Sequence, residues 1–340
     1  MYITFTKSQI FPNSYDAEQA LGALVTLLKT NEAMLMVGAG SSMRVGYPSW
    51  KQLISDLGNH LNPPVPANGD LIQIAEEIKK RLIAVGRGQE YEKFLNRTFG
   101  PKQPAFDDAH LIMLGLGFSG IVTSNYDPVL ESAMNEIFQS QGDRKHCEAI
   151  DLCDDRRRHE LHDFLHAVSS RQHQTSILHL HGYYQNPSGL VLTQLDYNQV
   201  YGDLVVSTEI DQKQVVQQSS LDTFHKKVLY ALLATKSFVF VGFSLNDPFF
   251  DAMLRIVHKD FGLGGDVYHC AILSHSSDED RIESIEKLLN HGILPIFYFV
   301  PPGSRDHSGL LRLLQEIAHK IGKPNSPRPI LDLARTLLEG

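Results

Sequence analysis

Four short segments of the chain combine glycine with polar side chains that can bind a ligand or transfer a proton. They are residues 37–42 (VGAGSS), 123–128 (TSNYDP), 178–182 (LHLHG) and 238–248 (FVFVGFSLNDP). In each segment, polar residues or glycine follow an apolar run. In open α/β sheets, ligands bind beyond the carboxyl ends of the strands. The four segments therefore predict one shared site at the edge of a sheet.

The segment 37–42 begins like a dinucleotide-binding fingerprint. Small residues at these positions let backbone N–H groups approach a pyrophosphate. They are Gly38, Ala39, Gly40 and Ser41. The last glycine position of the fingerprint holds Met43, and we expect no helix until after Pro48. A tight turn between a strand and a helix is the alternative explanation for the glycines.

The segment 123–128 offers an amide and a carboxylate at the end of a second apolar run. Asn125 and Asp127 are expected to project toward the same edge of the sheet as the glycine loop. We interpret Asn125 as a catalytic candidate, and Ser124 and Asp127 as ligand-binding candidates. For Asp127, capping of the following helix is an equally good interpretation, because aspartate is a common N-cap. Asn125 has the alternative of only supporting the turn.

The segment 178–182 carries two histidines. Alternation along a strand predicts that His179 and His181 share one face, with His181 at the end of the strand. A histidine titrates near neutral pH and can accept or donate a proton. A metal site would need a third ligand, and no other histidine or cysteine has suitable spacing. We expect His181 to be catalytic and His179 to be a core histidine with its hydrogen bonds satisfied.

The segment 238–248 is an apolar strand that opens into polar residues suited to the ribose and adenine half of a nucleotide. The candidates are Gly242, Ser244, Asn246 and Asp247. The alternative is a plain loop before a helix, because Asp247 followed by Pro248 is typical of a capped helix start.

These segments need a framework of strands and helices to position them. Short runs that are apolar on both faces alternate with helical patterns, which indicates buried parallel strands covered by helices on both sides. The predicted strands are 33–37, 120–123, 176–180, 238–241, 269–273 and 294–299. The predicted helices are 17–30, 49–61, 70–84, 107–117, 128–139, 155–170, 220–234, 248–261, 279–291 and 308–321. The fold class is therefore α/β, with a doubly wound, Rossmann-like, mainly parallel sheet.

We divide the chain into three parts. Residues 1–30 form an N-terminal helical segment, 31–300 the main domain, and 301–340 C-terminal helices. The alternation of strand and helix is weakest near 60–106 and 140–225, which we interpret as helical inserts forming a smaller subdomain.

Composition narrows the class of function. At 340 residues with 42% hydrophobic and 21% charged residues, the chain is an ordinary globular protein. Its 31 lysines and arginines are outnumbered by 39 acidic residues, for a net charge of -8. A broad basic surface is therefore missing, and we expect no strong direct binding to nucleic acid.

Location and metal content follow from two further features. The N-terminus does not read as a secretory signal, and no run of 18 apolar residues occurs, so we expect a cytoplasmic protein without a membrane anchor. Its three cysteines suit neither a disulfide framework nor a four-thiolate zinc site. They are Cys147, Cys153 and Cys270. No structural zinc is expected.

Taken together in this order, the four segments resemble the sirtuin superfamily, and more closely its divergent bacterial branch found in antiphage defence. The similarity covers about residues 30–260. The family's Gly-Ala-Gly-Ser loop, its Gly-Ile-Pro and its aromatic residue look like residues 38–41, 46–48 and Trp50 here. Its Gln-Asn-Ile-Asp, His-Gly and Gly-Thr/Phe-Ser blocks look like 124–127, 181–182 and 242–244.

The resemblance implies that residues 31–300 are an NAD-binding catalytic domain. The glycine loop would cradle the phosphates, and the segment with Pro48 and Trp50 would close over the nicotinamide end. Deacylase sirtuins carry paired Cys-x-x-Cys zinc ligands and an aliphatic residue where this chain has Tyr126. These departures disfavour deacylation and are shared by relatives that hydrolyse NAD outright.

The expected function is therefore hydrolysis of NAD to nicotinamide and ADP-ribose, as a regulated effector of bacterial antiphage defence. Asn125 would position a water or the ribose hydroxyls, His181 would act as a base or orient a ribose hydroxyl, and Asp127 would bind the nicotinamide amide. Two alternatives are a module that senses NAD or ADP-ribose without turnover and an NAD-dependent protein deacylase. Control is expected from a homo-oligomer or from a partner such as a HerA-type ATPase.

Overall fold

The computed structural model describes residues 5–6, 15–170, 175–202, 221–243, 245, 247–262, 266–304 and 306–323. Within them, seven strands form one sheet in the order β4-β5-β3-β2-β6-β8-β9, and every neighbouring pair is parallel. The strands are β2 Met34–Val37, β3 Gly120–Thr123, β4 Glu148–Asp151, β5 Ser176–His179, β6 Phe238–Val241, β8 His269–His275 and β9 Ile293–Phe299. A separate antiparallel pair joins β1 Phe5–Thr6 to β7 Asp266–Val267. The predicted α/β class with a parallel sheet is confirmed.

The order of the strands reverses between β2 and β6. From β2 the chain first builds outward through β3 and β5, and it then returns to add β6, β8 and β9 on the other side. Val37 is in register with both Thr123 and Val241, and Thr123 is in register with His179. Four strand ends are therefore level, and the segments that follow them emerge at one edge, beside the reversal point where such sheets bind ligands.

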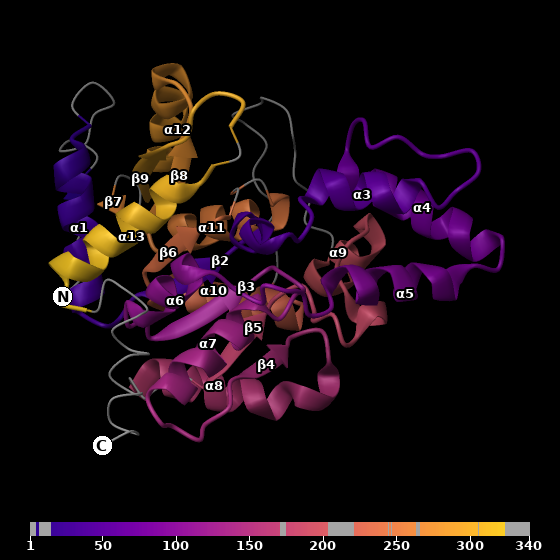
Figure 1. Cartoon of the computed structure of the whole chain (residues 1–340), viewed down its shortest axis with the longest axis horizontal. Coiled ribbons are helices and arrows are strands. Elements are labelled where there is room, and N and C mark those ends of the chain that lie inside the picture. The colour runs from indigo at the N-terminus through magenta and orange to yellow at the C-terminus, as the bar shows by residue number, and fades with distance from the viewer. Residues whose placement is uncertain are drawn as a thin grey trace.

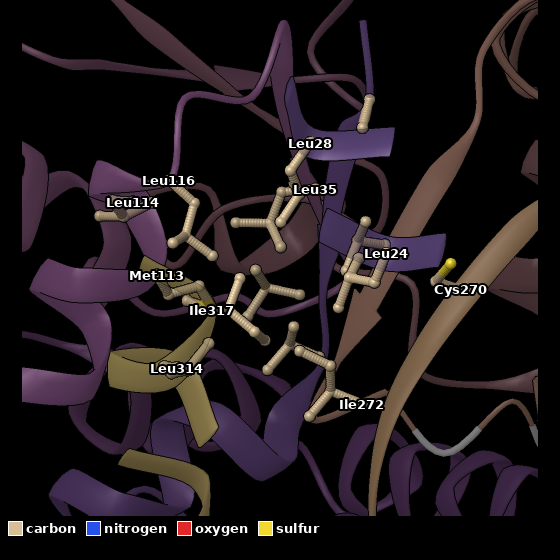
Figure 2. Packing of buried hydrophobic residues seen from close by; sticks show 14 of the residues in the cluster. Leu24, Leu28, Leu35, Met113, Leu114, Leu116, Cys270, Ile272, Leu314 and Ile317 are labelled. Atoms are coloured by element: carbon tan, nitrogen blue, oxygen red, sulfur yellow. The ribbon is translucent and has the colours of Figure 1, made fainter. Parts of the chain in front are cut away.

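Helices cover both faces of the sheet, because alternate strand residues point to opposite sides. One face packs against α1 Ala17–Lys29, α6 Asp108–Gly115, α7 Val129–Ser140, α12 Asp278–Asn290 and α13 Ser308–Lys320. In this layer, Leu35 and Ile272 of the strands meet Leu24, Met113 and Ile317 of the helices (Figure 2). The other face packs against α8 Arg158–Ser170, α9 Gln194–Tyr201, α10 Phe224–Thr235 and α11 Pro248–Asp260.

Three further helices form a unit at one side of the sheet. They are α3 Trp50–Gly58, α4 Leu71–Ala84 and α5 Gly88–Phe99, and they project together beside α9 (Figure 1). Their own apolar cluster includes Tyr126 and Val129, which follow β3. An ion pair of 2.8 Å between Lys79 and Asp196 joins α4 to α9. The helical unit is thus packed directly against one of the predicted site segments.

Several elements differ from the sequence predictions. The strand β4, the helix α5 and the helix α9 were not predicted, and β4 adds an edge strand from the weakly patterned region near 140–225. The expectation of no helix before Pro48 is wrong, since α2 Ala39–Ser42 and a 3₁₀ turn, Met43–Val45, follow β2 directly. Such short elements lack the repeated apolar spacing on which sequence prediction depends. The predicted segment beyond residue 323 lies outside the described residues.

Within the described part of the chain, we find no helix long and apolar enough to cross a membrane.

Candidate active site

The two glycine-containing loops after β2 and β6 lie in direct backbone contact. The N–H of Gly38 donates to the carbonyl of Val241 at 3.0 Å, and the N–H of Gly40 donates to the carbonyl of Gly242 at 2.9 Å. A Cβ at Gly38 would lie 2.5 Å from the oxygen of Gly242, and a Cβ at Gly242 would lie 2.5 Å from the N of Ser41. Gly242 also has a φ of 63°, which disfavours other residues. Close approach of two loops is therefore one physical reason for the glycines.

The glycine loop still presents an open surface at the edge of the sheet. Ala39 and Gly40 are exposed, whereas Ser41 is buried and donates its N–H to the carbonyl of Gly38 at 3.0 Å. The N–H groups of Gly38, Gly40 and Ser41 are thus already used inside the protein. A ligand would meet the exposed backbone around Ala39 and Gly40.

Asn125 is buried and tethered at almost every polar atom. Its N–H donates to Thr123 Oγ1 at 3.0 Å, and its Nδ2 donates to the carbonyl of Gly38 at 3.1 Å and to Ser42 Oγ at 2.9 Å. Its carbonyl oxygen lies 2.7 Å from His179 Nδ1. Its Oδ1, in contrast, is buried and has no hydrogen-bond partner among the described residues. The amide is held firmly and keeps one free acceptor.

Asp127 lies in the same network. Its Oδ1 accepts hydrogen bonds from Ser42 Oγ at 3.0 Å and from the N–H of Val129, the first residue of α7, at 3.2 Å. Burial raises the pKa of Asp127 to about 6, against the opposing effect of those two bonds, and the nearby Glu131 raises it further. Asp127 therefore does support the helix start, and it also shares Ser42 with Asn125.

His181 is buried among aromatic and acidic groups. Its Nε2 lies 3.1 Å from the Tyr201 hydroxyl and 3.7 Å from Asp247 Oδ2. Burial lowers the pKa of His181, and the charge of Asp247 partly offsets this. Burial also raises the pKa of Tyr201 well above its ordinary value, so the hydroxyl keeps its proton. His181 is thus a neutral imidazole at neutral pH and can accept a proton.

The two histidines were predicted to share one face of the strand, but His181 lies beyond the strand and has different surroundings from His179. The strand β5 ends at His179, and Gly182 turns the chain with a φ of 91°, so alternation does not extend to His181. His179 contacts Asn125 and Glu131, whereas His181 contacts Tyr201 and Asp247. His179 is fully buried with both ring nitrogens within hydrogen-bonding distance of a partner, as expected of a core histidine.

The fourth segment reaches the site through Asp247. Its Oδ1 caps α11 by accepting from the N–H groups of Phe249 and Phe250, both at 2.9 Å. Its Oδ2 accepts from the Tyr197 hydroxyl at 3.0 Å and faces His181. One oxygen of this aspartate therefore caps the helix, as the second interpretation expects, and the other faces the imidazole. Ser244 and Asn246, the other polar candidates of the segment, lie outside the described residues.

The remaining candidates lie at the border of the site. The N–H of Ser124 donates to the carbonyl of Val37 at 3.3 Å, which places Ser124 next to the glycine loop. Pro48 precedes α3 and Trp50 is its first residue, packed against the apolar cluster of the helical unit. No hydrogen bond or ring contact of the described residues joins Pro48 or Trp50 to Asn125 or His181.

Sequence reasoning missed four residues of the site. They are Ser42, Glu131, Tyr197 and Tyr201, each of which contacts a predicted site residue. One spacing contains a usable signal, because Tyr197 and Tyr201 of α9 are four residues apart. On a helix, such pairs lie on one face.

A cysteine and a histidine also meet near this site. Cys153 Sγ lies 3.5 Å from His225 Nε2. Burial raises the pKa of the Cys153 thiol and lowers the pKa of His225 to about 4. The thiol is therefore neutral and not an activated nucleophile. Among the described residues, no group of three or more histidine, cysteine, aspartate or glutamate side chains is arranged to hold a metal ion.

Comparison with known proteins identifies relatives of the chain. Residues 119–296 match the family described as SIR2-like domain. Three proteins named NAD(+) hydrolase ThsA are similar at low identity: 23% over 227 residues in Enterococcus faecium, 25% over 252 in Bacillus cereus (strain MSX-D12) and 24% over 263 in Acinetobacter baumannii (strain 532279). These matches cover 67%, 74% and 76% of this chain but only 40%, 45% and 46% of the relatives. The chain thus spans less than half the length of these relatives.

Proposed function

The chain belongs to the SIR2-like domain family, and on that premise we propose that it is an NAD hydrolase, which uses water to cleave NAD into nicotinamide and ADP-ribose. The names of three relatives support this activity. The site supports it independently, because the segments that resemble the sirtuin motifs meet at one edge of the sheet.

The observation that carries the proposal is the Oδ1 of Asn125, which is buried and has no hydrogen-bond partner in the described part of the chain. A buried amide oxygen without a hydrogen bond costs roughly 1–3 kcal/mol, so proteins seldom keep one without a purpose. The other polar atoms of Asn125 form hydrogen bonds within the protein, and these bonds fix the direction in which Oδ1 points. A water or a ribose hydroxyl would satisfy it, and either one has to be oriented for the reaction.

His181 is suited to take the proton that hydrolysis releases. In the reaction, the water oxygen bonds to the ribose carbon, the bond from that carbon to nicotinamide breaks, and its electron pair leaves with the neutral nicotinamide ring. The proton of the water passes to the neutral imidazole, directly or through a ribose hydroxyl. Asp247, 3.7 Å from Nε2, would stabilise the resulting positive charge.

We assign the binding of NAD to the same edge of the sheet. The phosphates would lie on the exposed backbone at Ala39 and Gly40, and Ser124 borders this loop. The carboxylate of Asp127 would accept from the nicotinamide amide. By resemblance, Pro48 and Trp50 would close over the nicotinamide end, while Gly242, Ser244 and Asn246 would face the ribose and adenine half.

Control of such an enzyme is part of the proposal, because unrestrained hydrolysis would exhaust the NAD of the cell. We propose a regulated effector of antiphage defence that acts on cytoplasmic NAD and is controlled by self-association or by a HerA-type ATPase. The resemblance to defence-associated sirtuins supports this assignment. Light scattering coupled to gel filtration, with and without such a partner, would test it, and a monomer that is fully active alone would contradict it.

The test of the activity is direct measurement of NAD loss and of its products by chromatography and mass spectrometry. Wild type is expected to release nicotinamide and ADP-ribose in equal amounts, unaffected by an acylated peptide. Asn125→Ala and His181→Ala are expected to lose this activity while they retain the wild-type circular dichroism spectrum. Stimulation by the peptide would instead indicate deacylation, and NAD binding without turnover, with or without candidate activators, would indicate a sensor.

A further inference from the structure

We propose that His179, held by Glu131, is a positioning residue that fixes the backbone of Asn125 for the reaction. The inference rests on the proposed hydrolase function and adds two residues that act through Asn125. His179 ends β5, Glu131 lies in α7, and Asn125 follows β3. The three residues thus tie two neighbouring strands and a covering helix to one point of the site.

The positions of the protons follow from the hydrogen-bond geometry. The Asn125 carbonyl can only accept, so the 2.7 Å contact requires that His179 Nδ1 carries a proton and donates it. The other ring nitrogen, Nε2, lies 2.7 Å from Glu131 Oε1. This second contact holds the ring in the orientation that aims Nδ1 at the carbonyl, as a carboxylate does for a histidine in many active sites.

The electrostatic surroundings favour a charged imidazolium. Burial by itself lowers the pKa of His179, but the charge and hydrogen bond of Glu131 outweigh burial, and the pKa is raised above its ordinary value. The carboxyl groups of Asp127 and Asp151 also interact electrostatically with this ring. The ring of Tyr183 packs against it, with 4.7 Å between the two ring centroids. The surrounding carboxylates therefore favour the form of the ring in which both nitrogens carry protons.

The consequence is that Asn125 is fixed at both ends of its backbone. Thr123 Oγ1 holds its N–H, and His179 holds its carbonyl. Nδ2 is bound by Gly38 and Ser42, and Oδ1 has no partner among the residues that the structure describes, so it can accept from a ligand. Without the His179 bond the carbonyl side of this anchor is released. A displacement of about 1 Å at a reacting group can lower the rate by about 10²-fold.

The test compares His179→Leu with His269→Leu. His269 is a matched control because it is a buried strand histidine whose Nδ1 accepts from a backbone N–H, that of Phe238 at 3.1 Å. Among the described residues, no hydrogen bond or ring contact joins it to Asn125, Asp127, His181 or Asp247. We expect His179→Leu to lower kcat for NAD by about 10²-fold with KM within about threefold. His269→Leu is expected to keep the kcat of wild type per folded molecule, although it also loses stability.

A second pair of variants keeps the test valid if His179→Leu does not fold. In Glu131→Gln, the amide can donate to Nε2 of a neutral His179, so Nδ1 keeps its proton and its bond to Asn125. In Glu131→Leu this support is lost. We expect Glu131→Gln to retain kcat within about threefold of wild type and Glu131→Leu to lose at least about tenfold. Equal kcat values in the two variants would overturn the proposal.

Deuterium exchange of the ligand-free protein separates this inference from the hydrolase proposal. The backbone amide hydrogens of residues 124–127, followed by mass spectrometry, are expected to exchange faster in His179→Leu than in wild type. In His269→Leu their exchange rate is expected to match that of wild type. If wild type does not hydrolyse NAD, the proposed hydrolase function is wrong. In that case the exchange rates of the variants still show whether His179 fixes the backbone of Asn125. Unchanged exchange in His179→Leu, or faster exchange with an unchanged kcat, would refute the positioning role.

Discussion

Replacement of Asp127 by asparagine is expected to stabilise the chain at neutral pH while it impairs the reaction. Asp127 is buried, and its folded-state pKa of about 6 lies above its ordinary value of 3.8. The folded chain therefore disfavours the ionised carboxylate, which is the form present at pH 7. An asparagine oxygen can still accept from Ser42 and Val129, and the amide carries no charge to bury.

The size of the effect follows from linkage. One pKa unit corresponds to about 1.4 kcal/mol, so a rise from 3.8 to about 6 costs up to about 3 kcal/mol once the group is ionised in both states. The pKa of Asp127 is higher in the folded state than in the unfolded state, so protonation of Asp127 stabilises the folded chain. This stabilisation is fully present below pH 3.8 and is lost as the pH rises through about 6. Asp127→Asn should exceed wild type by up to about 3 kcal/mol at pH 7, and the gap should close near pH 4.

Urea unfolding of both proteins between pH 4 and pH 8 measures this gap directly. Asp107 offers a control, because its pKa shift and the resulting effect on stability have the opposite sign. Burial raises its pKa, but bonds from His110 and Arg44 outweigh burial and hold the pKa of Asp107 below its usual range. Asp107→Asn should therefore lose stability at neutral pH, and this loss should fade as the pH falls. An Asp127→Asn variant that is no more stable than wild type at pH 7, or a gap that does not depend on pH, would refute the argument.

Activity and packing give further predictions. Asp127→Asn should lower NAD hydrolysis at least about tenfold despite its stability, since the proposed acceptor for the nicotinamide amide is altered; unchanged kcat/KM would exclude that role. Asn125→Ala should lower kcat about 10²-fold or more, with a native circular dichroism spectrum; residual activity near wild type would exclude Asn125 as the positioning group. Asp247→Asn removes a charge that raises the pKa of His181, so the acid limb of the kcat/KM profile should move to lower pH; a limb that stays in place would argue against His181 as the base. Gly242→Ala should lower the free energy of unfolding by more than the roughly 1–2 kcal/mol expected for Gly142→Ala, because Gly142 has a similar φ of 69° but open space around it; equal losses in urea unfolding would show that close approach of the loops is unimportant.

The location of the site was predictable from local patterns. Apolar runs flanked by helical patterns identified the strands that bound it, because strands covered on both faces need side chains that are apolar throughout. The carboxyl ends of parallel strands meet at one edge, so polar residues after those runs had to gather there. Asn125, His181 and Asp247 were found in this way, and the structure brings each of them to the same edge of the sheet.

Other features depended on contacts that local patterns do not encode. The edge strand β4 was not predicted, since its sequence Glu-Ala-Ile-Asp begins and ends with a charged residue and forms no apolar run. The glycines at 38 and 242 were interpreted through a ligand, whereas the structure shows that each also makes room for the other loop. Sequence spacing cannot show which backbones cross, because Gly38 and Gly242 are far apart along the chain.

The two histidines show most clearly which properties the sequence sets and which depend on tertiary contacts. The sequence by itself predicted a strand over residues 176–180 that carries His179 and ends next to His181. Only the tertiary structure decided that His179 meets Glu131 of α7, which raises its pKa, while His181 meets Tyr201 of α9 and has its pKa lowered by burial. The physical reason is that the charge of a buried histidine depends on the polar groups packed around it, and those groups come from distant parts of the chain.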